Sequence, residues 1–112
     1  MGYKVGDDIE FITNLKDRND DPILLSSLEG YGVEIYLDDT LIGKWGNNLT
    51  GFTDDYWSVQ GTSSVKFKIP STEITSVGNY YGEFKIAFSD ADYPDSLRDL
   101  YGKRKLLFRV TR

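Results

Sequence analysis

Short segments in which apolar and polar residues alternate recur along the chain, and no segment has the 3.6-residue period of a helix of useful length. The clearest example is 64–69, where Val65, Phe67 and Ile69 alternate with two lysines. A period of two is typical of a strand that has one face on a core and the other in solvent. The alternation therefore predicts an all-β chain, and the many aromatic residues suit rings packed on pleated sheet faces.

About seven strands are predicted from this alternation and from the turn-forming residues between the segments. They cover 8–15, 32–37, 40–45, 56–59, 64–69, 80–89 and 103–111, with a further strand fragment at 23–25. Runs of strands without helices between them favour a sandwich or a barrel. Because 112 residues fit one domain, we expect a single antiparallel β-sandwich of the immunoglobulin-like class that spans 1–112.

The same alternation assigns side chains to the two faces of each strand. In the strand at 32–37, Val33 and Ile35 are expected to face the core, whereas Glu34 and Tyr36 face outward. Glu83 also alternates with apolar neighbours and is expected in solvent. The last strand has three residues that are expected to point inward: Leu106, Phe108 and Val110.

The chain contains no cysteine and no histidine. Disulfides, a thiol nucleophile and zinc–thiolate chemistry are therefore excluded, and the commonest general base and metal ligand is missing. Carboxylates that alternate with apolar residues on an open sheet are usually solvated, so a glycosidase pair is not expected either. We therefore expect a protein that is not an enzyme, with no catalytic residues, no bound metal and no cofactor.

The chain carries 13 basic and 18 acidic residues, which give a formal net charge of −5. Affinity for phosphate comes from clustered lysine and arginine, so an acidic chain is not expected to bind nucleic acid or anionic membranes. The exception is a basic patch made of Arg98 and the segment 103–112. It only weakly indicates nucleic-acid binding, because no recognised binding module accompanies it, and an acidic neighbouring subunit or no role is the favoured interpretation. No run of apolar residues approaches the length of a membrane span.

A tyrosine corner is predicted at Val77-Gly78-Asn79-Tyr80, directly before a strand. In immunoglobulin-like sandwiches, a tyrosine near the start of a late strand bonds to the backbone a few residues upstream. Tyr80 occupies that position, although Ser76 stands where an aspartate is usual.

Gly6-Asp7 precedes the first strand, and a polar turn with Pro22 follows it. Later come the strand 65–69, the Gly-x-Tyr strand and a final strand. This order of parts resembles the immunoglobulin-like domains of bacteriophage tail and baseplate proteins, especially the N-terminal domain of baseplate upper proteins. The segments 46–61 and 90–102 depart from the resemblance because they are longer than is usual there.

The resemblance implies a structural or adaptor part of a phage or prophage virion, in the tail, baseplate or head accessory structures. It implies no catalytic motif. The expected partners are other virion or structural proteins, with self-association as a further expectation. The expected location is the virion, made in the cytoplasm of a bacterial host, and an extracellular location is the alternative.

Four aromatic residues in and beside the long segment 46–61 are the candidate binding residues: Trp45, Phe52, Tyr56 and Trp57. Exposed aromatic rings flanked by Asn and Asp suit a sugar-stacking platform, which makes a carbohydrate-binding module the alternative function. The same residues suit a protein interface, where Tyr and Trp are enriched. Trp45 also fits the core tryptophan of a sandwich, whereas Trp57 follows two aspartates and is expected outside the core.

Aspartates occur in clusters, and the best arrangement for calcium is Asp90, Asp92 and Asp95. The spacing does not match an EF-hand loop, which has a defined order of acidic residues, a glycine and a closing glutamate. Aspartate is common in turns because its side chain bonds to nearby backbone. The turn role is therefore the favoured interpretation of this segment.

Overall fold

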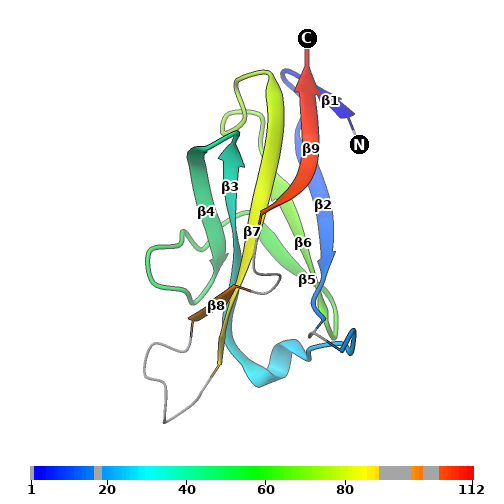
Figure 1. Cartoon of the computed structure of the whole chain (residues 1–112), viewed down its shortest axis with the longest axis vertical. Helices are drawn as coiled ribbons and strands as arrows, with labels where there is room; N and C mark the ends of the chain where they lie inside the picture. The colour runs from blue at the N-terminus through cyan, green and yellow to red at the C-terminus, as the bar shows by residue number, and fades with distance from the viewer. Residues whose placement is uncertain (1, 17–18, 89–96, 100–103) are drawn as a thin grey trace.

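Two β-sheets stack face to face in the computed structural model, which describes residues 2–16, 19–88, 97–99 and 104–112 (Figure 1). The strands within these residues are β1 (Gly2–Lys4), β2 (Ile9–Asn14), β3 (Leu28–Leu37), β4 (Thr40–Asn47), β5 (Trp57–Gly61), β6 (Ser64–Ile69), β7 (Gly78–Phe88), β8 (Leu97–Asp99) and β9 (Lys105–Thr111). A short 3-10 turn, η1 (Leu25–Ser27), precedes β3.

The larger sheet has the strand order β1-β9-β7-β3-β4, and β8 also pairs with β7. The smaller sheet has the order β2-β6-β5. These are the G–F–C–C′ and B–E–D orders of an immunoglobulin-like sandwich, with β1 added beside the last strand. The predicted all-β sandwich is therefore confirmed. Among the described strands all pairs are antiparallel except β1 with β9, which is parallel.

Two strands were not predicted, and one predicted fragment is not a strand. Strands β1 and β8 have three residues each, which is too short to establish an alternating pattern. The apolar fragment 23–25 instead leads into the 3-10 turn, and the N–H of Ile23 donates to the carbonyl of Leu15 at 2.9 Å. The hairpin of β3 and β4 is as predicted, and Asp38 in its turn has a φ of 52°.

Most inward assignments are confirmed by burial. In β6, Val65, Phe67 and Ile69 are at most 1% exposed, and Val33 and Ile35 of β3 are fully buried. These side chains meet residues of the opposite sheet in one core. The alternation is therefore reliable where a strand pairs in a regular register.

The last strand corrects one assignment. Tyr80 pairs with Phe108 but Tyr81 pairs with Leu106, so β9 contains a β-bulge at Leu107. Phe108 and Val110 face the core as predicted, whereas Leu106 points outward and is 55% exposed. Leu107 replaces it on the inner side and packs into the space that Gly82 leaves by having no side chain.

The tyrosine corner has the expected geometry. The hydroxyl of Tyr80 donates a hydrogen bond to the carbonyl of Ser76 at 2.6 Å. The ring is 1% exposed and stacks on Phe108 with 4.9 Å between ring centroids. Ser76 can stand in place of the usual aspartate because Tyr80 bonds to the backbone carbonyl of residue 76 and not to its side chain. The corner ties the turn before β7 to the core.

Replacing Tyr80 with Phe tests the corner. The variant keeps the stacked ring but loses the hydrogen bond to Ser76, so the free energy of unfolding should fall by about 1 kcal/mol. Urea unfolding followed by tryptophan fluorescence measures this change. Tyr81→Phe is the matched control, because that ring lies on the outer face, and it should change stability by less than about 0.5 kcal/mol. Equal losses in the two variants would contradict the role of the corner.

Candidate functional site

The outer face of the larger sheet is an exposed surface built from cross-strand pairs. Tyr36 of β3 pairs with Leu41 of β4 on one side and with Tyr81 of β7 on the other, and Tyr81 pairs with Leu106 of β9. These four residues form an apolar row across four strands. Leu41 is 44% and Leu106 is 55% exposed, so the row is open to solvent at both ends.

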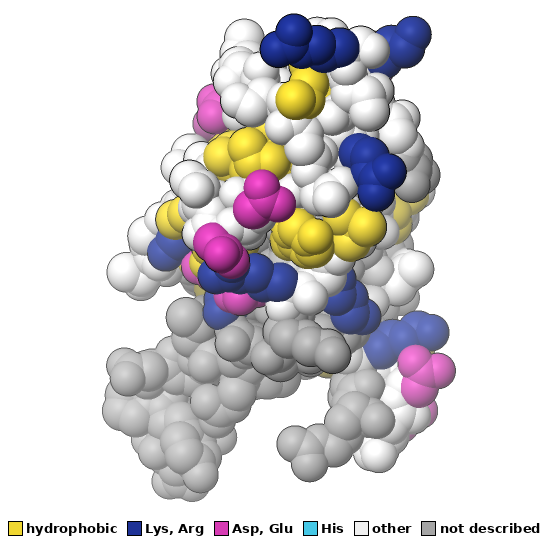
Figure 2. Space-filling model, turned by 45° about the horizontal axis from the view of Figure 1, so that its top comes forward, with side chains coloured by type: hydrophobic (Ala, Val, Ile, Leu, Met, Phe, Trp, Pro, Cys, Tyr) yellow, Lys and Arg dark blue, Asp and Glu magenta, His cyan; other side chains and the backbone are white. Residues whose placement is uncertain are grey.

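Beside the apolar row lies a charge cluster of six residues: Glu34, Asp39, Lys44, Glu83, Lys85 and Arg104. The Glu34 carboxylate forms ion pairs with Nζ of Lys44 at 3.5 Å and with Nζ of Lys85 at 3.7 Å. Glu83 pairs with Lys85 at 3.4 Å and with Arg104 at 2.9 Å. Three carboxylates face three cations, so the cluster carries no net charge. Figure 2 shows hydrophobic side chains next to groups of opposite charge on one face of the molecule.

Glu34 corrects a second assignment. It does lie on the outer face, but the residue is only 8% exposed rather than solvated. Glu34 and Glu83 are directly opposite each other on β3 and β7, and two like charges in this position repel. Lys85 contacts both carboxylates, and the surrounding cations therefore make the close approach of the two glutamates stable. Neighbouring side chains bury Glu34, and its own strand pattern did not show this.

Tyr36 joins the apolar row to the charge cluster. Its hydroxyl donates to Oε1 of Glu34 at 3.1 Å, and the Arg104 guanidinium lies 3.5 Å from the centre of its ring. The pKa of the Tyr36 phenol is raised, mainly because burial disfavours its charged form and secondly because its hydroxyl hydrogen-bonds to Glu34. The hydrogen bond to Glu83 raises the pKa of Arg104, so the guanidinium stays charged. These contacts hold the tyrosine ring in one orientation on the surface.

Phe52 is the one predicted binding residue that lies on this face. A Cβ atom on Gly32 of β3 would lie 2.9 Å from the Phe52 ring, so the ring covers that glycine. Nζ of Lys44 lies 5.4 Å from the ring centroid, within the range of a cation–π contact. Phe52 thus borders the charge cluster on the side away from the apolar row.

The other three predicted aromatic residues lie on the inner side of the sheet, so the four do not form one exposed platform. Trp45 is 4% exposed and packs over Gly43 inside the sandwich, which is the core role that its position also allowed. Tyr56 lies beside Trp45 with 5.6 Å between ring centroids. Trp57 meets Tyr31 edge-on at 5.5 Å and is half-buried, because it points from β5 toward the core.

These inner aromatic residues close the side of the sandwich between β4 and β5. The Trp57 indole N–H donates to Asp54 at 2.5 Å, so this aspartate binds the edge of a ring that points toward the core. The segment before them also covers the edge of β4. The N–H of Gly46 donates to the Thr53 carbonyl, and the Thr53 N–H donates to the Lys44 carbonyl, both at 3.0 Å.

The remaining candidates do not come together as sites in the described part of the chain. Within the described part of the chain, no group of three or more acidic residues is arranged to hold a metal ion. Asp90, Asp92 and Asp95 lie outside the described residues. The predicted basic patch is divided, because Arg104 belongs to the charge cluster and Arg109 donates to Asn79 at 2.8 Å. Among the described residues, no helix has the length and hydrophobicity needed to cross a bilayer.

The apolar row was missed in the sequence because it depends on register. Tyr36 was predicted to face outward, and Tyr81 has the opposite parity to the buried Tyr80. The signal for the row was therefore present as two outward tyrosines on separate strands. Their adjacency follows only from the pairing of β3 with β7.

Comparisons with known proteins add no family to these observations. No protein-family model matches the chain, and no curated protein is significantly similar to it.

Replacing Glu34 with Gln tests the charge cluster. The change removes the charge that Lys44 and Lys85 share, so the free energy of unfolding should fall by about 1–3 kcal/mol at pH 7. Urea unfolding measures the loss. Glu29→Gln is the matched control, because Glu29 is an exposed glutamate on the same strand, and it should have little effect. A Glu34 variant as stable as the control would contradict a cohesive role for the cluster.

Alkaline pH tests the environment of Tyr36. Its raised pKa means that the folded state keeps the phenol proton at a pH where the unfolded chain loses it. This contribution to stability is complete below about pH 10, the ordinary pKa of tyrosine, and is lost as the pH rises through the folded pKa. Urea unfolding between pH 9 and 11 should therefore show a smaller decline for Tyr36→Phe than for the wild type. Identical declines would contradict this assignment.

Proposed function

We propose that this chain is a non-catalytic structural or adaptor domain that binds other proteins through the outer face of its larger sheet. The observation that supports the proposal is the apolar row of Leu41, Tyr36, Tyr81 and Leu106, which is exposed at both ends and lies beside a charge cluster without net charge. Tyrosine and arginine are enriched at the centres of protein interfaces, where rigid rings provide contact area at little entropic cost.

The charge cluster prepares the face for a protein partner. Its carboxylates and cations are already paired with each other, so a partner need not supply counter-charges for them. Tyr36 is fixed by Glu34 and Arg104, which reduces the side-chain entropy lost on binding. A preorganised face of this kind suits the surface of another structural subunit.

The proposed setting is a phage or prophage virion, with other virion proteins as partners. It rests on the order of sequence motifs that resembles baseplate and tail domains. The chain contains no cysteine or histidine, and the carboxylates of the outer face are engaged by lysine and arginine, which supports a non-catalytic role. The alternative, a carbohydrate-binding module, has less support because Trp45 is buried and Phe52 lies on the other side of the sheet.

Co-expression with the products of neighbouring genes tests the proposal. A partner that co-purifies with the wild-type chain should be lost, or bound at least about tenfold more weakly, after Leu41→Asp, because a charge would enter the apolar row. Val59→Asp is the matched control, because Val59 on β5 is another exposed apolar residue, at 58% against 44% for Leu41. Binding that survives Leu41→Asp, or is lost equally in the control, would overturn the assignment of this face.

A further inference from the structure

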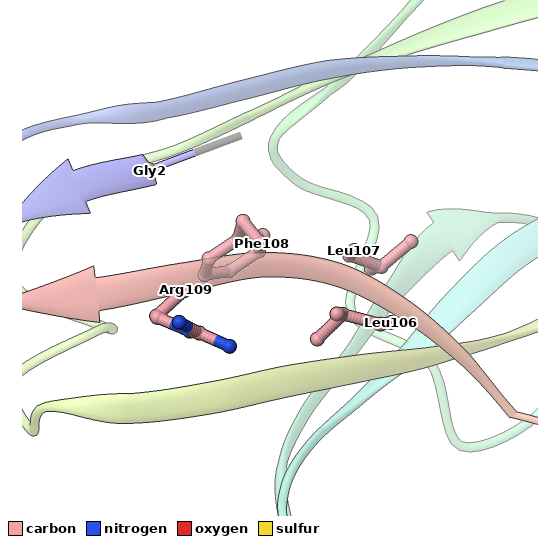
Figure 3. Close-up of a pocket in the computed structure, with 5 residues that line it drawn as sticks. All are labelled: Gly2, Leu106, Leu107, Phe108 and Arg109. Atoms are coloured by element: carbon pink, nitrogen blue, oxygen red, sulfur yellow. The ribbon is translucent and has the colours of Figure 1, made fainter.

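Arg109 borders the apolar row at its Leu106 end. In the register of β7 and β9, Asn79 pairs with Arg109 and Tyr81 pairs with Leu106, and the buried Tyr80 lies between these two outward pairs. Figure 3 shows the side chains of Arg109 and Leu106 on the same side of β9. Arg109 is exposed, so its guanidinium is open to a partner that covers the apolar row.

Asn79 orients the Arg109 side chain without neutralising it. The Nε–H of Arg109 donates to Oδ1 of Asn79 at 2.8 Å. An amide oxygen accepts this hydrogen bond but carries no formal charge. No carboxylate among the described residues forms an ion pair with the guanidinium. Asn79 therefore holds a full positive charge in place, with the terminal nitrogens of Arg109 still able to donate.

The other cations on this face are used differently. Lys44, Lys85 and Arg104 each contact a carboxylate of the charge cluster. Along β7 the outward residues run from Asn79 through Tyr81 to Glu83, so Arg109 and Glu83 lie on opposite sides of the apolar row. One side of the row is thus occupied by charges that satisfy each other, and the other side has a cation that is oriented but not paired.

A hollow of about 450 Å³ opens beside Arg109. Val77 and Thr111 line it, and Val77 is 42% exposed, so apolar surface adjoins the guanidinium. Asp38 and Arg112 line the same hollow, but Asp38 forms no ion pair with either arginine. The hollow therefore leaves room for a side chain from outside to reach Arg109.

The surroundings of Arg109 are remote from the far end of β7. Phe88 is the last described residue of that strand and lies nine residues, or about 30 Å, along it from Asn79. At the near end, Gly2 of β1 pairs with the backbone of Arg109. Figure 3 places Gly2 on the side of β9 away from the Arg109 side chain.

We propose that Arg109 is the carboxylate-binding residue of the outer face. Its terminal nitrogens donate two parallel hydrogen bonds to an aspartate or glutamate side chain of the partner, while the apolar row covers apolar side chains next to that carboxylate. A single carboxylate is the favoured anion, because the net charge of −5 opposes phosphate-rich polymers. This inference rests on the proposed function and adds the chemistry of the partner: a protein with a carboxylate beside an apolar patch.

The probe is a capped pentapeptide with the order leucine, serine, glutamate, serine, leucine. An extended backbone places its glutamate and both leucines on one face. The matched peptide has glutamine in place of glutamate, and acetate alone is the control for the bare anion. In an NMR titration the glutamate peptide should shift the Nε–H signal of Arg109 and the amides of Tyr36 and Tyr81. It should bind about fivefold more tightly than the glutamine peptide.

Arg109→Gln and Asn79→Asp are the decisive variants. The first removes the cation, whereas the second keeps Arg109 but gives it a carboxylate partner within the chain. Each should abolish the preference for the glutamate peptide. Arg112→Gln is the matched control, because it removes the same charge from the same hollow, and the preference should persist there.

Equal binding of the two peptides to the wild type would overturn the inference. So would a preference that survives Arg109→Gln, one that is lost equally in Arg112→Gln, or acetate that binds as tightly as the glutamate peptide. An Arg109 signal that depends on protein concentration without peptide would assign the carboxylate to a second copy instead of a partner. Shifts at Tyr36 and Tyr81 with none at Arg109 would overturn this inference alone, whereas peptide binding unaffected by Leu41→Asp would also overturn the proposed function.

Discussion

Tyr80 is held from two sides, and this arrangement fixes the centre of the larger sheet. Its hydroxyl bonds to the Ser76 carbonyl, and its ring stacks on Phe108. Strand β7 starts at this point and pairs with both β3 and β9. The position of β7 therefore decides which side chains of its neighbours meet on the outer face. The apolar row and the charge cluster both depend on this register, because each takes residues from at least three strands.

The alternating pattern predicted the sandwich because most strands pair regularly. It failed at Leu106 because the β-bulge at Leu107 changes the parity of the strand, and a bulge has no signature in local composition. The predicted solvent exposure of Glu34 was wrong for a different reason. Its burial comes from Lys44, Lys85 and Tyr36, which are close only after folding.

The candidate site was harder to predict than the fold because it is made of pairs rather than motifs. The aromatic residues around 46–61 are a group in the sequence, yet the strand that carries Trp45 separates its ring from that of Phe52. In contrast, Tyr36 and Tyr81 are far apart in the sequence and become neighbours through one cross-strand pair. Prediction of such a face requires strand register, which depends on long-range pairing.

The neutrality of the charge cluster has a kinetic consequence. The chain carries a net charge of −5, but within the charge cluster three cations balance three carboxylates. The paired groups of the cluster add little to the long-range field, so any electrostatic steering of the proposed partner toward this face would come from the other charges of the chain. In the proposed complex, a change in the tyrosine contacts would act mainly on the dissociation rate, which is the usual origin of affinity differences between related complexes.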